Sequence, residues 1–88
     1  HITEVKERFK YQLSKLSRDK RIYVVLGKDE ISELVKIAVK ELNKPNSIQL
    51  GNAEDIDPAS CLVIVLDNEL LSDYKNKGYE VVNLVERI

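Results

Sequence analysis

Apolar residues recur along this chain with two different spacings, which together predict helices that alternate with strands. Over residues 2–16 the apolar positions are three or four apart, the spacing of one helix face. This face consists of Ile2, Val5, Phe9, Leu13 and Leu16. We expect Thr3 to cap the helix. Cations favour the carboxyl end of a helix, where we expect Arg18, Lys20 and Arg21.

A strand and a second helix are predicted next. RIYVVLG (21–27) is rich in β-branched and aromatic residues and stops at Gly27, which favours a strand. DEISELVKIAVKELN (29–43) has helical spacing, with Asp29 as N-cap, Glu30 near the positive end of the dipole, and Ile37 outside the apolar face. The residue before Pro45 avoids the helical region, so the helix ends there. The predicted buried face consists of Ile31, Leu34, Val35, Ala38 and Leu42, with Val39 beside it.

Three more strands and one helix complete the pattern. SIQL (47–50) is a short strand followed by Gly51, and AEDIDPAS (53–60) is an acidic loop. CLVIVL (61–66) is apolar throughout, which indicates a central strand with both faces covered and parallel neighbours. NELLSDYKNKG (68–78) predicts a helix with Asp67 as N-cap and Gly78 just past its end. YEVVNLV (79–85) is the last strand.

The order α-β-α-β-β-α-β predicts an α/β fold, a small α/β/α sandwich with a four-stranded, mostly parallel or mixed sheet. Its 88 residues suit one domain, residues 1–88. Ligands of such sheets bind at the carboxyl ends of the strands, here Gly27–Glu30 and Asp67–Glu69. The chain opens at His1 and has no methionine, which indicates a trimmed or altered start.

Charge is distributed unevenly although the net charge is only −1. Residues 1–21 hold seven Lys/Arg against three Asp/Glu, and the remainder holds seven against twelve. On the first predicted helix the basic residues away from the apolar face are Lys6, Arg8, Lys10 and Lys15. Two interpretations stay open: a solvated face, or contact with phosphate or with an acidic partner.

The common catalytic and metal sites lack their parts in this sequence. One cysteine, Cys61, and one terminal histidine supply no Ser-His or Cys-His pair and no zinc site. VVLGKDEISELV (24–35) has one glycine, and its acids oppose a bound phosphate. Two groups of acidic residues have the carboxylates that a cation would need. They are Asp29 with Glu30, Asp67 and Glu69, and Glu54 with Asp55 and Asp57. Capping and solvation explain both groups, so we expect no metal and no cofactor.

The turn Gly27-Lys28-Asp29-Glu30-Ile31-Ser32-Glu33 resembles the recognition turn of the kink-turn-binding ribosomal protein family of archaea and eukaryotes. Gly27 and Glu30 match that turn, whereas Asp29 replaces a base-reading amide and Glu33 replaces a lysine. AEDIDP resembles another stretch of the family. The resemblance implies a related α/β/α sandwich, and RNA contact through Gly27, Lys28 and Glu30. In general character the chain also resembles small crenarchaeal proteins, such as accessory subunits of a B-family DNA polymerase.

These observations favour a non-enzymatic interaction module that serves as an accessory subunit of a larger complex. Its docking patch would use the basic helix, or Ile37 with some of Tyr11, Tyr23, Tyr74 and Tyr79. Alternatives are an RNA- or DNA-binding protein, an accessory subunit of an archaeal B-family DNA polymerase, or a homodimer. The lone cysteine and the lack of a signal peptide or apolar span favour the cytoplasm. The composition, rich in Lys, Glu, Ile and Val, favours a thermophilic source. The resemblances imply an archaeal one.

Overall fold

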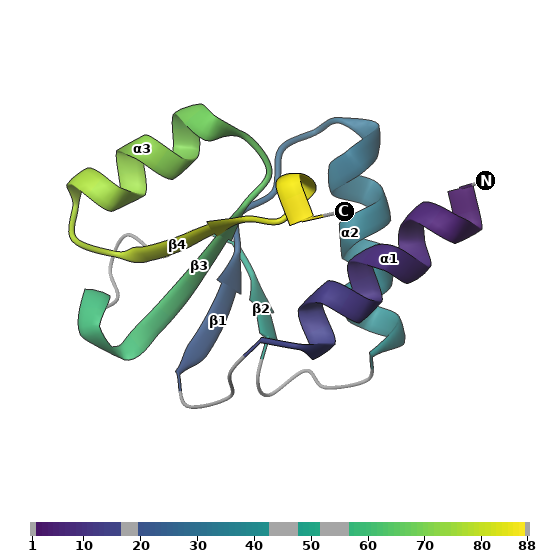
Figure 1. Cartoon of the computed structure of the whole chain (residues 1–88), viewed down its shortest axis with the longest axis horizontal. Helices are drawn as coiled ribbons and strands as arrows, with labels where there is room; N and C mark the ends of the chain where they lie inside the picture. The colour runs from purple at the N-terminus through teal and green to yellow at the C-terminus, as the bar shows by residue number, and fades with distance from the viewer. Residues whose placement is uncertain (1, 17–19, 43–47, 52–56, 88) are drawn as a thin grey trace.

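The computed structural model describes residues 2–16, 20–42, 48–51 and 57–87. Its element order agrees with the predicted α-β-α-β-β-α-β order, with two short 3₁₀ helices added (Figure 1). The elements are α1 (Ile2–Ser14), β1 (Arg21–Val24), α2 (Glu30–Glu41), β2 (Ile48–Leu50), η1 (Pro58–Ser60), β3 (Cys61–Val65), α3 (Asn68–Asn76), β4 (Glu80–Asn83) and η2 (Val85–Arg87).

The sheet is parallel throughout and has the strand order β2-β1-β3-β4. All five residues of β3 are buried, which confirms that the apolar run at 61–65 is a central strand. β2 and β4 form the two edges of the sheet. The chain moves from β1 outward to β2 through α2, and from β3 outward to β4 through α3. Because the strands are parallel, the carboxyl ends of all four lie at the same end of the sheet.

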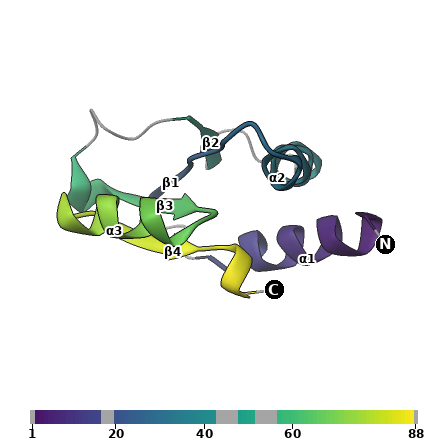
Figure 2. The same ribbon diagram turned by 90° about the horizontal axis from the view of Figure 1, so that it is seen from above.

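Two hydrophobic cores lie on opposite faces of this sheet. On one face α1 and α2 pack on each other and on the strands through Phe9, Leu13, Val35 and Ala38. On the other face α3 packs over β3 and β4, with Tyr74 beside Val63 and Val65. Figures 1 and 2 show the resulting three layers, with the α1–α2 pair and α3 on opposite sides. The predicted α/β/α sandwich is therefore confirmed.

The caps of α3 agree with the predictions. The Asp67 carboxylate accepts the backbone N–H of Leu70 at 2.8 Å, as an N-cap does. Gly78 follows the C-cap residue Lys77 and adopts a φ of 93°, a region that favours glycine. The helix therefore begins and ends where its sequence signals lie.

Several predictions of detail were wrong. α1 already begins at Ile2, so Thr3 lies within the helix and does not cap it. The helix ends at Ser14, well before the basic cluster: Lys20 pairs with Glu80 and Arg21 begins β1. Ile31 is 39% exposed, and the neighbouring Ser32 is buried in its place. Arg18 lies outside the described residues.

Gly27 and β4 also differ from prediction. The strand before Gly27 ends at Val24, and Gly27 is not one of the glycines with positive φ, so no left-handed turn requires it. β4 covers only Glu80–Asn83 of the predicted 79–85. Tyr79 lies before the strand and packs in the core on the α3 side, and the 3₁₀ helix η2 begins at Val85. The strand thus stops where Leu84 turns into the core on the α1–α2 side.

Candidate functional site

The basic residues of α1 are largely engaged within the fold. Lys6 Nζ lies 2.8 Å from one Glu41 carboxylate oxygen, and Lys10 Nζ lies 3.2 Å from the other. Lys10 also lies 3.4 Å from Glu7. Hydrogen bonds from Lys6 and Lys10 lower the pKa of Glu41, and the bond to Glu41 raises the pKa of Lys10. These two lysines therefore join α1 to α2.

The other two basic residues of α1 stay within their own helix. Arg8 lies 3.6 Å from Glu4, one turn earlier, and both side chains are largely exposed. The Lys15 ammonium lies 5.0 Å from the centre of the Tyr11 ring. The four predicted contact residues thus do not form a uniform basic surface, because acidic groups and one ring stand among them.

The turn before α2 uses its polar groups to begin the helix. Asp29 accepts the backbone N–H of Ser32 at 3.1 Å, so its predicted role as N-cap is confirmed. The Ser32 hydroxyl in turn accepts the backbone N–H of Gly27 at 2.9 Å. Hydrogen bonding to Ser32, first through its side chain and then its backbone, lowers the pKa of Asp29. The backbone N–H groups of Gly27 and Ser32 are therefore already bonded and not available to a phosphate. Lys28 and Glu30 are exposed beside them.

Near the carboxyl ends of β3 and β4, the side-chain amides of Asn68 and Asn83 form a hydrogen bond. Asn83 Nδ2 donates to Asn68 Oδ1 at 3.0 Å, while Asn83 Oδ1 accepts the backbone N–H of Val85. Asp67 caps α3 beside this pair. Within the described residues no three His, Cys, Asp or Glu side chains come close enough to hold a metal ion. The convergence of Asp29, Glu30, Asp67 and Glu69 that the sequence allowed does not occur.

The acidic loop and the cysteine have structural explanations. Asp57 caps η1 by accepting the backbone N–H of Ala59 at 3.1 Å. Glu54 and Asp55 lie outside the described residues. Cys61 is fully buried in the α3-side core, and burial raises the pKa of its thiol. Of the described residues of these two groups, Asp57 is exposed and caps η1, and the Cys61 thiol does not reach the surface.

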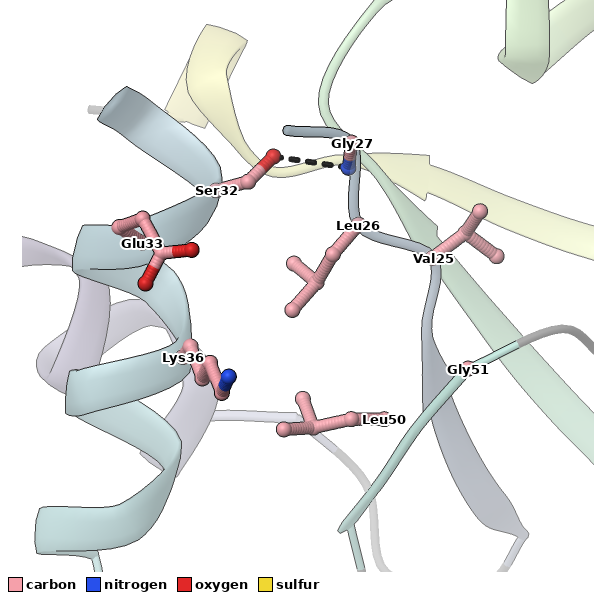
Figure 3. A pocket seen from close by; sticks show the side chains of 8 residues that line it. All are labelled: Val25, Leu26, Gly27, Ser32, Glu33, Lys36, Leu50 and Gly51. Carbon is pink, nitrogen blue, oxygen red and sulfur yellow. Dashed lines mark hydrogen bonds between the residues drawn. The ribbon is translucent and has the colours of Figure 1, made fainter. Parts of the chain in front are cut away.

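A cavity of about 420 Å³ lies between α2 and the carboxyl ends of β1 and β2 (Figure 3). We call it the β2 cavity. Leu26 and Leu50 form its apolar walls, and Ser32, Glu33 and Lys36 line the helix side. Val25 contributes mainly backbone, because its side chain packs with the core on the α3 side. The full lining is Val25, Leu26, Gly27, Ser32, Glu33, Lys36, Leu50 and Gly51.

The sequence predicted a binding site at the carboxyl ends of the strands, but it did not predict this cavity. Gly27 is the one predicted site residue in its wall, whereas Lys28 and Glu30 are not part of it. That Leu50, Glu33 and Lys36 line one cavity could not be predicted, because only the strand order places β2 beside β1 and near α2. The exposure of Leu50, 39%, reflects its place at the end of an edge strand.

The polar side chains around the β2 cavity are Ser32, Glu33 and Lys36. Its two charged groups, Glu33 and Lys36, are exposed, and no ion pair links either of them to another described residue. The Ser32 hydroxyl is already bonded to Gly27. Apolar walls with a few polar groups at the rim are typical of binding sites.

Comparison of the chain with protein-family models, with curated proteins and with solved structures finds no match. Across the part of the chain that the structure describes, no helix is long and apolar enough to cross a membrane.

Proposed function

We propose that this chain is a small non-enzymatic interaction module that acts as an accessory subunit of a larger protein complex. The observation that carries the proposal is the β2 cavity, an apolar recess beside an edge strand of the sheet. Leu50 stands partly exposed at its wall, and Ile37 is 43% exposed on the same helix that lines it. Ile37 is not part of the cavity lining, whereas Leu26 and Leu50 form its apolar walls. An apolar recess at the surface, with a further exposed apolar side chain on the adjoining helix, favours a protein contact site.

Of the four tyrosines considered for a docking patch, three are unsuited to it. Tyr23, Tyr74 and Tyr79 are buried in the α3-side core, where the rings of Tyr74 and Tyr79 meet edge to face at 5.3 Å. Tyr11 is 60% exposed, with Lys15 over its ring. The docking surface that we propose is therefore Leu50, Ile37 and the β2 cavity, and Tyr11 is a separate exposed position.

The alternative function, binding of RNA or DNA through α1 and the turn at Gly27–Glu33, is less well supported. Lys6 and Lys10 would have to leave Glu41, and Asp29, Glu30 and Glu33 would repel phosphate at the turn. A gel-shift titration separates the two functions. A phosphate-binding protein loses orders of magnitude in affinity between about 50 and 200 mM salt, and we expect no such loss here. Steep salt-sensitive binding that Arg8→Glu and Lys15→Glu remove would favour the alternative.

Affinity purification of the tagged chain from its native organism, followed by mass spectrometry, tests the proposal directly. We expect one stoichiometric complex with the wild-type chain, and its loss with Leu50→Asp or Ile37→Asp. Ala59→Asp is the matched control, because it adds the same charge at an exposed position on η1. An archaeal B-family DNA polymerase among the captured proteins would identify the specific complex considered above. Capture that is equal for wild type and Leu50→Asp would contradict the proposed surface.

A further inference from the structure

We infer that the β2 edge and the β2 cavity bind an extended, acidic segment of the partner protein. This inference depends on the proposed function and names the chemistry of its partner. Three features carry it: an unpaired strand edge, an apolar recess directly beside that edge, and basic groups on the helix above it.

Among the described residues, no strand pairs with the outer edge of β2. Gly51 donates its backbone N–H to Val24 O at 3.0 Å, across the β1–β2 pair. Alternate residues of a strand direct their N–H groups the same way, so the N–H of Leu50 points away from β1. β2 ends the sheet, and no described strand pairs with that side. An added peptide strand would therefore find main-chain donors and acceptors there.

The apolar recess gives such a strand a place for one side chain. Ile48 lies in the core on the α1–α2 side, so Leu50, two residues later, lies on the same face of the sheet. Leu50 and Leu26 form the apolar walls of the β2 cavity on that face. A partner residue that pairs beside Leu50 can place an apolar side chain against these two leucines.

The charge of α2 beyond the cavity selects an acidic partner. Lys36 points toward Leu50 in Figure 3, and Lys40 follows it by one turn on the same side of the helix. No ion pair links either lysine to another described residue, and both are exposed. Along the helix they are about 6 Å apart, close to the separation of about 6.6 Å between alternate residues of a strand. An acidic residue two positions from the apolar one therefore reaches Lys40.

Glu33 fixes the direction of this arrangement. It lines the cavity at the Gly27 end, whereas Lys40 lies at the opposite end of α2. An acidic residue is repelled near Glu33 and attracted near Lys40, so the acid faces the Ile48 end of β2. A second copy of this chain fits less well, because antiparallel pairing of β2 with itself would place the lysines of both α2 helices side by side.

Selection from a displayed library of random peptides about ten residues long, with the full chain as bait, tests the inference. We expect enriched peptides that carry an acidic residue two positions from an apolar one. For a synthetic peptide of that sequence, fluorescence anisotropy should show about tenfold weaker binding to the double variant Lys36→Glu, Lys40→Glu. Replacing the acid of the peptide by lysine should restore binding to that variant. Lys15→Glu with Lys75→Glu, the matched control, should bind as the wild type does.

Other outcomes overturn the inference. Enriched peptides without acids, equal binding by the charge-reversed variant, or unchanged binding by Leu50→Ala would each contradict it, and so would a dimer in sedimentation that pairs through β2. The affinity purification distinguishes this failure from that of the proposed function. A complex that Leu50→Asp abolishes but Lys36→Glu with Lys40→Glu preserves keeps the docking surface and removes the acidic partner.

Discussion

The Lys6 ammonium nitrogen lies 2.8 Å from a carboxylate oxygen of Glu41, and this ion pair connects the first helix to the second. Lys10 reaches the other oxygen of the same carboxylate. Two of the four basic residues that lie away from the apolar face of α1 are thereby directed toward α2, to an acid of the same fold. A charge pattern that suggests a phosphate-binding helix in sequence serves helix packing in the structure.

Replacement of this shared carboxylate should remove a pH-dependent part of the stability. The pKa of Glu41 is lower in the folded chain than its ordinary value of 4.5, so its contribution is present above that value and is lost as the pH falls through the folded pKa. We expect Glu41→Gln to lower the thermal midpoint at pH 7, and to lower it less at an acidic pH below 4.5. Thermal unfolding by circular dichroism at both pH values measures this.

Glu4→Gln is the matched control for this change. It removes a carboxylate that, among the described residues, pairs with Arg8 on the same exposed helix face. A small effect at both pH values is expected, because exposed pairs one turn apart contribute little. Equal effects of Glu41→Gln and Glu4→Gln at pH 7 would contradict the role of Glu41 as a link between helices.

Two glycines should respond differently to alanine. Gly78 has a φ of 93°, where a side chain is strained, so Gly78→Ala should cost about 1–2 kcal/mol in the free energy of unfolding. At Gly27 an added Cβ would meet Ser32 Oγ at 3.6 Å and Asp29 Oδ1 at 3.8 Å, ordinary contacts. Gly27→Ala should therefore be nearly neutral in urea unfolding. A large loss at Gly27 alone would show that its turn requires glycine.

The same substitution at two isoleucines separates folding from docking. Ile64 is fully buried in β3, so Ile64→Ala should cost about 2–5 kcal/mol. Ile37 is 43% exposed on α2, so Ile37→Ala should change the free energy of unfolding by less than about 1 kcal/mol while weakening capture of the partner. Urea unfolding gives the first quantity and affinity purification the second. A strongly destabilised Ile37→Ala chain would place that side chain in the core.

Asp67 should behave as a helix cap. Its carboxylate accepts the N–H of Leu70, and Asp67→Ala should cost about 1 kcal/mol. Asp67→Asn retains an acceptor oxygen and should lie close to wild type in thermal unfolding. If Asp67→Asn instead kept the fold and abolished a measured enzymatic activity, the capping role would be insufficient and an enzyme would be indicated.

The sequence was sufficient for the elements that local chemistry determines. Asp29 and Asp67 lie directly before helical patterns and cap them, and the apolar run from Cys61 to Val65 is the central strand. The sequence was not sufficient for contacts between segments that are far apart along the chain. Neither the partner of Lys6 nor the neighbours of Leu50 follow from spacing along the chain, because they depend on the α1–α2 contact and on the strand order.

At the end of a helix, the residue that is buried could be predicted only to within one position. Ile31 shares the helical phase of Val35 and Ala38, yet it lies in the first turn of α2 and is partly exposed. Ser32 is buried because its hydroxyl and backbone bond to Gly27 and Asp29. A polar residue that satisfies the start of a helix can thus take the buried position that periodicity assigns to its neighbour.

Backbone amide hydrogen exchange on the purified complex is the most direct test of the proposed docking surface. Docking at the β2 cavity predicts slower exchange in the complex at Leu50, at Gly51 and along Glu33–Lys36, with α1 unchanged. Protection confined to α1, or exchange at β2 that is the same with and without the partner, would contradict it.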